Sequence, residues 1–501
     1  MYDVFVIGGG INGVGVAADA ATRGLKVGLC EQHDLASATS SNSSKLIHGG
    51  LRYLEHYEFR LVREALAERE VLLANAPHIM WPMRFALPHQ PHLRPQWMIR
   101  IGMFLYDHLA KRVSLPSSQK VATTTDSPLV DSITTCFEYS DGWVDDARLV
   151  VLNAVQAKQH GAQIMTQTEC VAVVNKGSHW DITLFNKLSG KHSQVTSKTL
   201  VNASGPWVER LFSSAINKPS PKKIRLVKGS HIVVPKIHVE DKAYILQNAD
   251  NRIVFVLPYE QDFSLVGTTD VDYQGDPKDV AIDADETQYI IDIANEYFKS
   301  KITTCDVVHT FSGVRPLIDD GADAASEATR DYTFEFDYGP DKAALLSIFG
   351  GKITTYRKLA EAAVDALRPV FRDLAECQTK HLALPGGDFV SQKQLVTHWA
   401  EKYPFLTTEV AQRYARQYGT LAECFLQDSV SLHELGEDFG AGLYAAEVRY
   451  LLKVEFATCT DDILWRRTKL GLHCDQINTT SLGQFISQDM QHPQSPLHDV
   501  A

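Results

Sequence analysis

The chain has 501 residues, of which 44% are hydrophobic and 22% are charged. This length predicts roughly two to four structural units, and the composition excludes disordered, collagen-like and coiled-coil chains. The 61 acidic and 49 basic residues give a net charge of −12, the wrong sign for a protein that binds nucleic acid over its whole surface. Any anionic ligand must therefore be held by a local cluster of positive groups.

Eight cysteines are scattered along the chain, and no two of them have a Cys-x-x-Cys spacing. We therefore expect reduced thiols, as in a cytosolic protein, and no metal site. The N-terminus lacks the basic region of a signal peptide, and no window approaches the roughly 18 apolar residues of a membrane-spanning helix. If this protein meets a membrane, we expect it to lie on the surface.

The first predicted elements are a strand, a glycine-rich turn and a helix. Residues 4–7 form an unbroken apolar run, which a Gly-x-Gly-x-x-Gly pattern and then small apolar residues follow. In this pattern Gly8 permits a tight turn, Gly10 lets the backbone approach a pyrophosphate, and Gly13 lets the helix pack close to the strand. The pyrophosphate would then meet the free N–H groups and the positive dipole end of the helix.

A second apolar strand, residues 27–30, ends at Glu31. A carboxylate here predicts an adenosine ribose with free hydroxyls rather than a 2′-phosphate. The chain then departs from simple strand–helix alternation, and residues 38–44 contain five hydroxyl side chains. Such a turn can wrap a polar cofactor tail, although an ordinary surface loop is the competing interpretation.

The middle of the chain predicts mainly strands. Residues 60–73 indicate a helix, and a segment rich in Pro and His, residues 77–95, breaks the periodicity as an insertion does. The apolar pair 200–201 ends a strand that enters a turn of small residues. Strand-like stretches then cluster at 232–235, 243–247, 252–258 and 263–267, which predicts an antiparallel meander.

A second glycine turn, Gly350-Gly351, lies between an apolar strand and a helix that we expect to begin at Thr354. A plain turn is the competing interpretation. Beyond a Pro-Gly-Gly linker at 385–387, helical patterns such as 407–418 and 442–458 alternate with short turns.

Taken together, these segments resemble the flavin-dependent glycerol-3-phosphate dehydrogenases, and most of all the bacterial, quinone-reducing aerobic type. The motifs that carry the resemblance are residues 8–31, 39–55, 228–233, 267–270, 313–317 and 349–361. They occur in the family's order from residue 2 to about residue 362, and the rest of the chain is similar to the family's helical C-terminal region. Single motifs also occur in flavoprotein amine and amino-acid oxidases, which are the closest alternative.

The resemblance implies a fold with α/β and α+β parts: a discontinuous Rossmann-like FAD-binding domain, an antiparallel-sheet substrate domain and a helical C-terminal cap. We place the FAD-binding domain at residues 1–75, 145–215 and 310–384, and the substrate-binding domain at 76–144 and 216–309. The helical domain is then 385–488, and we expect a disordered tail at 489–501.

The resemblance also implies the residues that contact FAD. Glycines would approach the pyrophosphate and the flavin ring, and short polar side chains would wrap the rest. The predicted FAD contacts are Gly8, Gly10, Gly13, Glu31, Thr39, Ser40, Ser41, Ser44, Lys45, His48, Gly49, Gly50, Leu51, Val171, Ala203, Ser204, Gly205, Trp207, Gly350, Gly351, Lys352, Ile353 and Thr354.

The implied reaction oxidises sn-glycerol 3-phosphate to dihydroxyacetone phosphate by hydride transfer to FAD, and electrons then pass to membrane quinone. An oxidase that uses O2 is the nearest variant. The reaction needs a base, and we predict His231, because imidazole titrates near neutral pH; His48 is the rival. Arginine offers a planar fork of donors to phosphate, and lysine adds a compact charge. The predicted catalytic residues are His231, Arg315 and Lys352, and the predicted substrate-binding residues are Arg52, Tyr53, Arg315, Arg330 and Lys352.

Residues 95–106 can form an amphipathic helix with Trp97, Ile101, Phe104 and Leu105 on one side. Helices of this kind also pack into protein cores, and residues 450–456 and 465–469 are other candidates for membrane contact. The resemblance favours peripheral attachment to the inner, cytoplasmic face of the cell membrane. The sequence is compatible with a homodimer but does not predict the oligomeric state. The second hypothesis is a flavoprotein whose FAD is structural and which serves as a binding or RNA-modifying scaffold. The net charge counts against an RNA partner.

Overall fold

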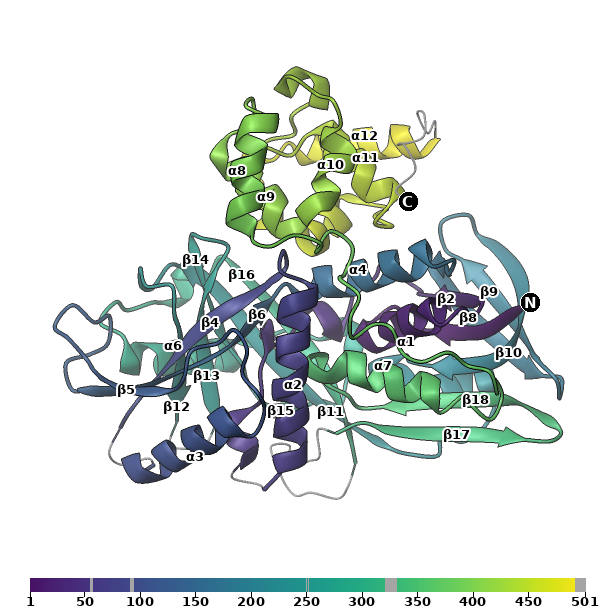
Figure 1. Ribbon diagram of the computed structural model, residues 1–501, viewed down its shortest axis with the longest axis horizontal. Helices are drawn as coiled ribbons and strands as arrows, with labels where there is room; N and C mark the ends of the chain where they lie inside the picture. The colour runs from purple at the N-terminus through teal and green to yellow at the C-terminus, as the bar shows by residue number, and fades with distance from the viewer. Residues whose placement is uncertain (55–56, 91–93, 249, 251, 320–330, 492–501) are drawn as a thin grey trace.

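The computed structural model describes residues 1–501 except 55–56, 91–93, 249, 251, 320–330 and 492–501, and two sheets form its body (Figure 1). In the first sheet, β1 pairs in parallel with β2 and β10, and β10 pairs in parallel with β18. The carboxyl ends of these four strands therefore meet at one edge. The strands of this sheet are β1 (Tyr2–Ile7), β2 (Val27–Cys30), β7 (Gln163–Met165), β8 (Thr168–Asn175), β9 (Trp180–Asn186), β10 (Lys191–Asn202), β17 (Thr333–Gly339) and β18 (Lys342–Phe349).

The second sheet is largely antiparallel. Its strand β11 pairs antiparallel with both β14 and β16, and β4 pairs antiparallel with β6. The strands are β3 (Leu46–Ile47), β4 (Met80–Pro88), β5 (Gln119–Ala122), β6 (Thr135–Val144), β11 (Ile224–Pro235), β12 (Ala243–Gln247), β13 (Ile253–Tyr259), β14 (Phe263–Gly267), β15 (Val271–Asp272) and β16 (His309–Ile318).

The two faces of the second sheet have different neighbours. Ile232 and Val234 of β11 belong to a core with residues of helix α6 (Ala284–Tyr297). Val233 belongs instead to the core that contains residues of α2 (Phe59–Asn75) and α3 (Gln96–His108). Because side chains alternate along a strand, residue 231 faces the same side as Val233.

Helix α1 (Ile11–Thr22) covers the first sheet together with α4 (Asp146–Gln159) and α7 (Tyr356–Asp365), while α5 (Val208–Leu211) follows β10. The C-terminal helices form a separate domain that lies over α4 (Figure 1). They are α8 (Gln392–Lys402), α9 (Thr408–Gln417), α10 (Glu423–Leu426), α11 (Ala445–Lys453) and α12 (Thr479–Gln491). Within the described ranges, every helix is too short or too polar to cross a membrane.

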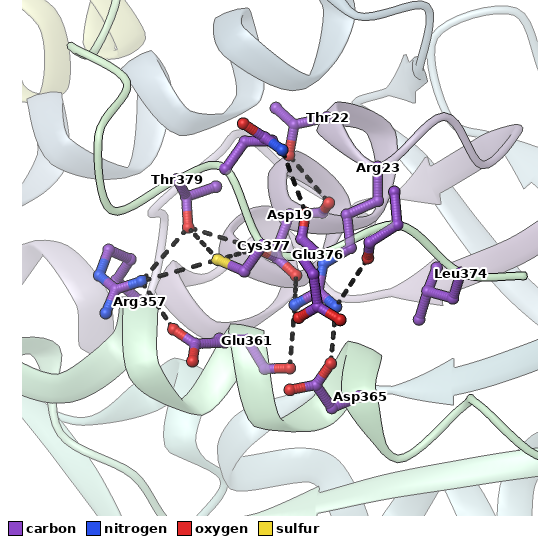
Figure 2. Close-up of polar contacts among 12 residues, drawn as sticks. Asp19, Thr22, Arg23, Arg357, Glu361, Asp365, Leu374, Glu376, Cys377 and Thr379 are labelled. Atoms are coloured by element: carbon purple, nitrogen blue, oxygen red, sulfur yellow. Dashed lines mark hydrogen bonds and ion pairs between the residues drawn. The ribbon is translucent and has the colours of Figure 1, made fainter.

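A polar cluster fastens the segment that leads to the C-terminal domain onto α1 (Figure 2). The Cys377 thiol donates a hydrogen bond to Oδ1 of Asp19 at 2.9 Å, and the Thr379 hydroxyl donates to the same oxygen at 3.3 Å. Arg23 lies 2.7 Å from Asp19 and 2.7 Å from Asp365 of α7. The cluster therefore fixes the end of α1 that lies farthest from the glycine turn.

The predicted fold class is confirmed, since a mixed α/β body carries a helical C-terminal region. The predicted domain bounds stay a prediction, and the strand pairing and the last helix differ from them at three places. Residues 46–47 and 310–318, which we assign to the FAD-binding domain, belong to the second sheet because β3 pairs with β6 and β16 pairs with β11. The predicted tail begins inside α12, which continues to Gln491. The remaining tail residues lie outside the described part of the chain.

Candidate cofactor and substrate site

A cavity of about 1620 Å³ lies where the carboxyl ends of the first sheet meet the second sheet. It is larger than the roughly 300–1,000 Å³ of a usual small-molecule pocket, so it has room for a dinucleotide and a second ligand. The first sheet contributes Gly8, Glu31 and Ala203 to its lining, and the second sheet contributes His231 and Arg315.

The glycine turn forms one wall of the cavity. Gly8 has φ +114°, and a Cβ there would lie 2.5 Å from the carbonyl oxygen of Ala203, so a larger residue would force β1 and β10 apart. Gly10 precedes α1 and supplies no side-chain cap. The first N–H groups of the helix therefore lie beside a cavity that can hold an anion.

Glu31 lies at the end of β2 and holds the turn in place. Its Oε2 accepts a hydrogen bond from the Gly9 amide at 2.7 Å, and its Oε1 accepts one from the His33 amide at 2.9 Å. Burial raises the pKa of this carboxyl, although the two amide bonds oppose the shift. Because a carboxylate has about four acceptor positions, two remain for ribose hydroxyls.

The hydroxyl-rich loop connects the two sheets. Ser40 accepts a hydrogen bond from the Ile11 amide at 3.0 Å, and Thr39 donates to the carbonyl of Val314 in β16 at 2.7 Å. Several residues of the loop line the cavity, namely Thr39, Ser40, Asn42, Ser43, Ser44, His48, Gly50 and Leu51.

Beyond this loop, two further predicted segments reach the cavity. They are the turn after β10, with Ala203, Ser204, Gly205 and Trp207, and the second glycine turn, with Gly350, Gly351, Lys352, Ile353 and Thr354. Asn12 fastens the second turn to α1, since its amide donates to the Gly350 carbonyl at 3.1 Å. A helical turn, Ile353–Thr355, begins directly after Lys352 and continues into α7.

Five predicted cofactor contacts do not line the cavity, namely Gly13, Ser41, Lys45, Gly49 and Val171. The Lys45 ammonium lies instead 2.7 Å from the buried carboxylate of Asp146. The Ser41 hydroxyl donates to the Ala38 carbonyl, and the Gly49 amide donates to the hydroxyl of Tyr106. Gly13 packs against the Gly8 carbonyl, and Cys170 rather than Val171 faces the cavity. These residues do not line the cavity themselves but hold the segments that do.

His231 lies on β11, on the side of the sheet that faces the cavity. Its side chain is almost fully buried, and it stacks on Phe311 with ring centroids 4.9 Å apart. Nε2 lies 2.9 Å from the Ser44 hydroxyl, while Nδ1 has no hydrogen-bond partner among the described residues. Burial, and then the positive charges of Arg315 and Lys45, lower the pKa of His231 well below 6.5. The imidazole is therefore neutral at pH 7.

Arg315 extends from β16 across the neighbouring strand β11. A Cβ at residue 229 would lie 2.4 Å from Nη2 of Arg315, so glycine at this position leaves room for the guanidinium. Nη1 lies 2.7 Å from Asp270, and Nη2 donates to the Thr268 hydroxyl at 3.0 Å. The side chain keeps 25% of its surface exposed and lines the cavity. The guanidinium is thus oriented before any ligand arrives.

Three other predicted substrate residues cannot be placed. Arg330 and the side chains of Arg52 and Tyr53 lie outside the described residues, although residues 52–53 lie in the helical turn Leu51–Leu54.

Comparison with known proteins identifies the family. Residues 3–357 match the model of FAD dependent oxidoreductases, and residues 377–484 match that of the C-terminal domain of alpha-glycerophosphate oxidase. This chain belongs to the FAD-dependent oxidoreductase family.

Among curated relatives of this oxidoreductase, "Glycerol-3-phosphate dehydrogenase" of Pseudomonas aeruginosa is 54% identical, over 99% of this chain and 96% of the relative. "Aerobic glycerol-3-phosphate dehydrogenase" of Escherichia coli K12 is 51% identical over 98% of both chains. "D-erythritol 1-phosphate dehydrogenase" of Brucella abortus is 48% identical over 97% of both. Among solved structures, glycerol-3-phosphate dehydrogenase of Bacillus halodurans complexed with FAD has a TM-score of 0.76 and 25% identity, and covers 99% of this chain and 92% of its own.

FAD is the cofactor of this oxidoreductase, and the residues of the cavity fit it. The turn beside α1 suits a pyrophosphate, because Gly8 and Gly10 line the cavity without side chains and so let an anion approach the start of the helix. Glu31 offers acceptors where an adenosine ribose would lie, and the second glycine turn, which Asn12 joins to α1, also lines the cavity. The individual FAD contacts stay a prediction.

Sequence reasoning missed two groups of cavity residues. Thr268 and Asp270 hold Arg315, and the Gly-Thr-Thr-Asp motif that contains them could have been paired with Gly-Val-Arg-Pro-Leu. The other group comes from α3, whose residues Met98, Ile99, Ile101, Gly102 and Leu105 line the cavity. We predicted this helix as amphipathic, and an apolar face beside a ligand site has the same pattern as one beside lipid.

Proposed function

We propose that this oxidoreductase oxidises sn-glycerol 3-phosphate to dihydroxyacetone phosphate. The observation that carries the proposal is the identity of 54% and 51%, over nearly the whole chain, to two relatives named glycerol-3-phosphate dehydrogenase. The cavity supports it, because His231, Arg315 and Lys352 come from distant segments and line one space. This set contains a base and the cations that a phosphorylated alcohol requires.

Bound FAD supplies the hydride acceptor. In our proposal the hydroxyl proton of the substrate goes to Nε2 of His231, the nitrogen that lies beside the cavity residue Ser44. A base must be neutral before the reaction, and burial keeps His231 so. The phosphate dianion then acts against the charges of Arg315 and Lys45, which favours the imidazolium that proton transfer forms.

Arg315 and Lys352 are the proposed anion-binding groups, with Arg52, Tyr53 and Arg330 as further predicted contacts. Arg315 suits this role because Asp270 and Thr268 orient its guanidinium while a quarter of its surface stays exposed. A planar fork that is already oriented loses little entropy when it binds phosphate. The division of roles between these cations stays a prediction.

We also propose that α3 attaches the protein to the inner face of the cell membrane and that quinone is the electron acceptor. Trp97, Ile101 and Phe104 are 65%, 53% and 62% exposed, although all three are apolar. An exposed apolar helix face of this kind suits the membrane interface. The helix lies across the body from the C-terminal domain (Figure 1), and it lines the cavity, so an apolar acceptor could reach the site from lipid.

Anaerobic titration of the FAD-loaded protein tests the substrate. Glycerol 3-phosphate should bleach the visible flavin absorbance, whereas glycerol and D-amino acids should not. D-erythritol 1-phosphate belongs in the same panel because of the 48% identical relative, and faster reduction by it would replace our substrate with the longer one. An unchanged flavin spectrum with both phosphates would reject the proposal.

The acceptor and the membrane helix are tested separately. A soluble quinone should reoxidise the reduced flavin faster than O2 does, and a peroxide assay separates dehydrogenase from oxidase. Flotation with anionic lipid vesicles should carry the unaltered protein upward but leave the Phe104→Glu variant behind. Val390→Glu, a change at another exposed apolar residue, is the control. Equal flotation of the two variants would remove α3 from the proposal.

A further inference from the structure

The C-terminal domain meets the cofactor-binding part of the body through buried charges. Nη1 and Nη2 of Arg467 lie 2.6 and 2.8 Å from the two carboxylate oxygens of Asp34. Arg466 lies 2.5 Å from the same carboxylate. The side chains of Arg467 and Asp34 are 0% and 2% exposed, so this is a two-pronged ion pair shielded from water.

Asp34 belongs to a segment that lines the cofactor cavity. Residues 31–33 and Ala36 are part of the lining. The Ala36 amide donates to the Gly9 carbonyl at 3.2 Å, and the Glu31 carboxylate accepts from the Gly9 amide at 2.7 Å. The segment and the glycine turn are therefore one hydrogen-bonded unit, and Asp34 joins this unit to the C-terminal domain.

A second contact supports the hydroxyl-rich loop. Nζ of Lys469 lies 2.9 Å from Asp145, which also accepts a hydrogen bond at the start of α4. The next residue, Asp146, accepts from the Ser43 hydroxyl at 2.7 Å and pairs with Lys45 at 2.7 Å. The C-terminal domain thus fixes both segments that surround the cavity on this side.

We propose that Arg467 and Lys469 are positioning residues for FAD, which they reach only through Asp34 and Asp145. Neither is among the residues that line the cavity. Without Arg467, the buried carboxylate of Asp34 would lose two of its charged hydrogen bonds, and its segment would shift to regain water. Glu31 would move with it. FAD would then have to order the segment on binding, which weakens its retention.

The test measures FAD release from the full-length holoenzyme after dilution, followed by the fluorescence of the released cofactor. Arg467→Gln should release FAD at least about tenfold faster than the unaltered protein, and Lys469→Met about threefold faster. Arg467→Lys should recover part of the loss, because it keeps the charge but not the two parallel donors.

Arg413→Gln is the matched control. Arg413 pairs with the buried Glu447 at 2.7 Å, but both residues lie inside the C-terminal domain. It should destabilise this domain while changing FAD release less than about twofold. Equal release from Arg413→Gln and Arg467→Gln, or unchanged release from Arg467→Gln, would overturn the proposal. If Arg467→Gln does not fold, Lys469→Met decides it, and unchanged FAD release from Lys469→Met would reject the proposal.

Discussion

The cavity and the contact beneath the C-terminal domain use charged side chains in opposite ways. In the cavity, Arg315 pairs with Asp270 but keeps a quarter of its surface exposed, and Nδ1 of His231 has no partner among the described residues. Beneath the C-terminal domain, Arg148 and Arg467 are fully buried and each is paired with a carboxylate. The cavity keeps part of the hydrogen-bonding capacity of its side chains for a ligand. Beneath the C-terminal domain the charged groups bond one another and so stabilise the fold.

The largest expected effect is on turnover. His231→Ala should lower kcat by roughly 10²–10⁴-fold, the usual contribution of a general base, while FAD content and melting temperature stay close to those of the unaltered protein. Rapid-mixing measurement of flavin reduction isolates this step. A proportional loss of FAD would mean that His231 is a structural residue, and the contrast between the two regions would weaken.

Breaking a pair beneath the C-terminal domain should have the reverse signature. Nη2 of Arg148 lies 2.8 Å from Oε1 of Glu455, so Arg148→Met leaves a buried carboxylate alone and should cost about 3–5 kcal/mol in the free energy of unfolding. The KM for substrate should change little. Lys198→Met breaks the exposed pair with Asp3 and should cost less than about 1 kcal/mol. Similar losses in the two variants, measured by urea unfolding, would contradict the assignment.

The third effect depends on pH. Burial, with a smaller contribution from Arg148, lowers the pKa of the fully buried His78 to about 3 from 6.5. The unfolded chain therefore takes up a proton between these values while the folded protein does not, so stability is fully present above pH 6.5 and falls as the pH is lowered toward 3. For one such histidine the loss is about 2 kcal/mol at pH 5.

His78→Leu should remove this part of the pH dependence, which melting temperatures recorded from neutral to acidic pH would reveal. The control is His398→Leu, a change at an exposed histidine of α8. If both variants keep the slope of the unaltered protein, the acid sensitivity comes from other groups.

Arg315→Ala tests anion binding in the cavity, and its effect on KM should be smaller than the effect of His231→Ala on kcat. Loss of a charge-assisted contact to phosphate is worth about 1.5–3 kcal/mol, so KM should rise roughly 10- to 100-fold, with a lesser change in kcat. The KM of Arg315→Lys should lie between those of the unaltered protein and Arg315→Ala. Equal changes in kcat and KM from Arg315→Ala and His231→Ala would undo the separation of anion binding from proton transfer.

The sequence predicts the cavity residues better than the ion pairs beneath the C-terminal domain, because the cavity follows from local patterns and the ion pairs do not. The strand, the glycine turn and Glu31 are local patterns that follow from backbone geometry, and the resemblance added His231 and Arg315. The pair of Asp34 with Arg467 joins residues 433 positions apart, and no local pattern in the sequence links the two. Lys45 shows the same limit: among hydroxyl residues it suggested a cofactor contact, but its partner Asp146 lies 101 positions away.

The smallest effect concerns the polar cluster that fastens the segment leading to the C-terminal domain onto α1 (Figure 2). Cys377→Ala removes the thiol donor to Asp19 and should cost about 1 kcal/mol, whereas Cys377→Ser keeps a donor and should cost less. Burial, together with the bond to Asp19, raises the pKa of the thiol. Alkylation of Cys377 should therefore be slower than that of the exposed Cys305, as mass spectrometry of the labelled peptides can measure. Faster labelling of Cys377 would mean that this segment leaves α1 in solution. The polar cluster would then not hold the segment in place.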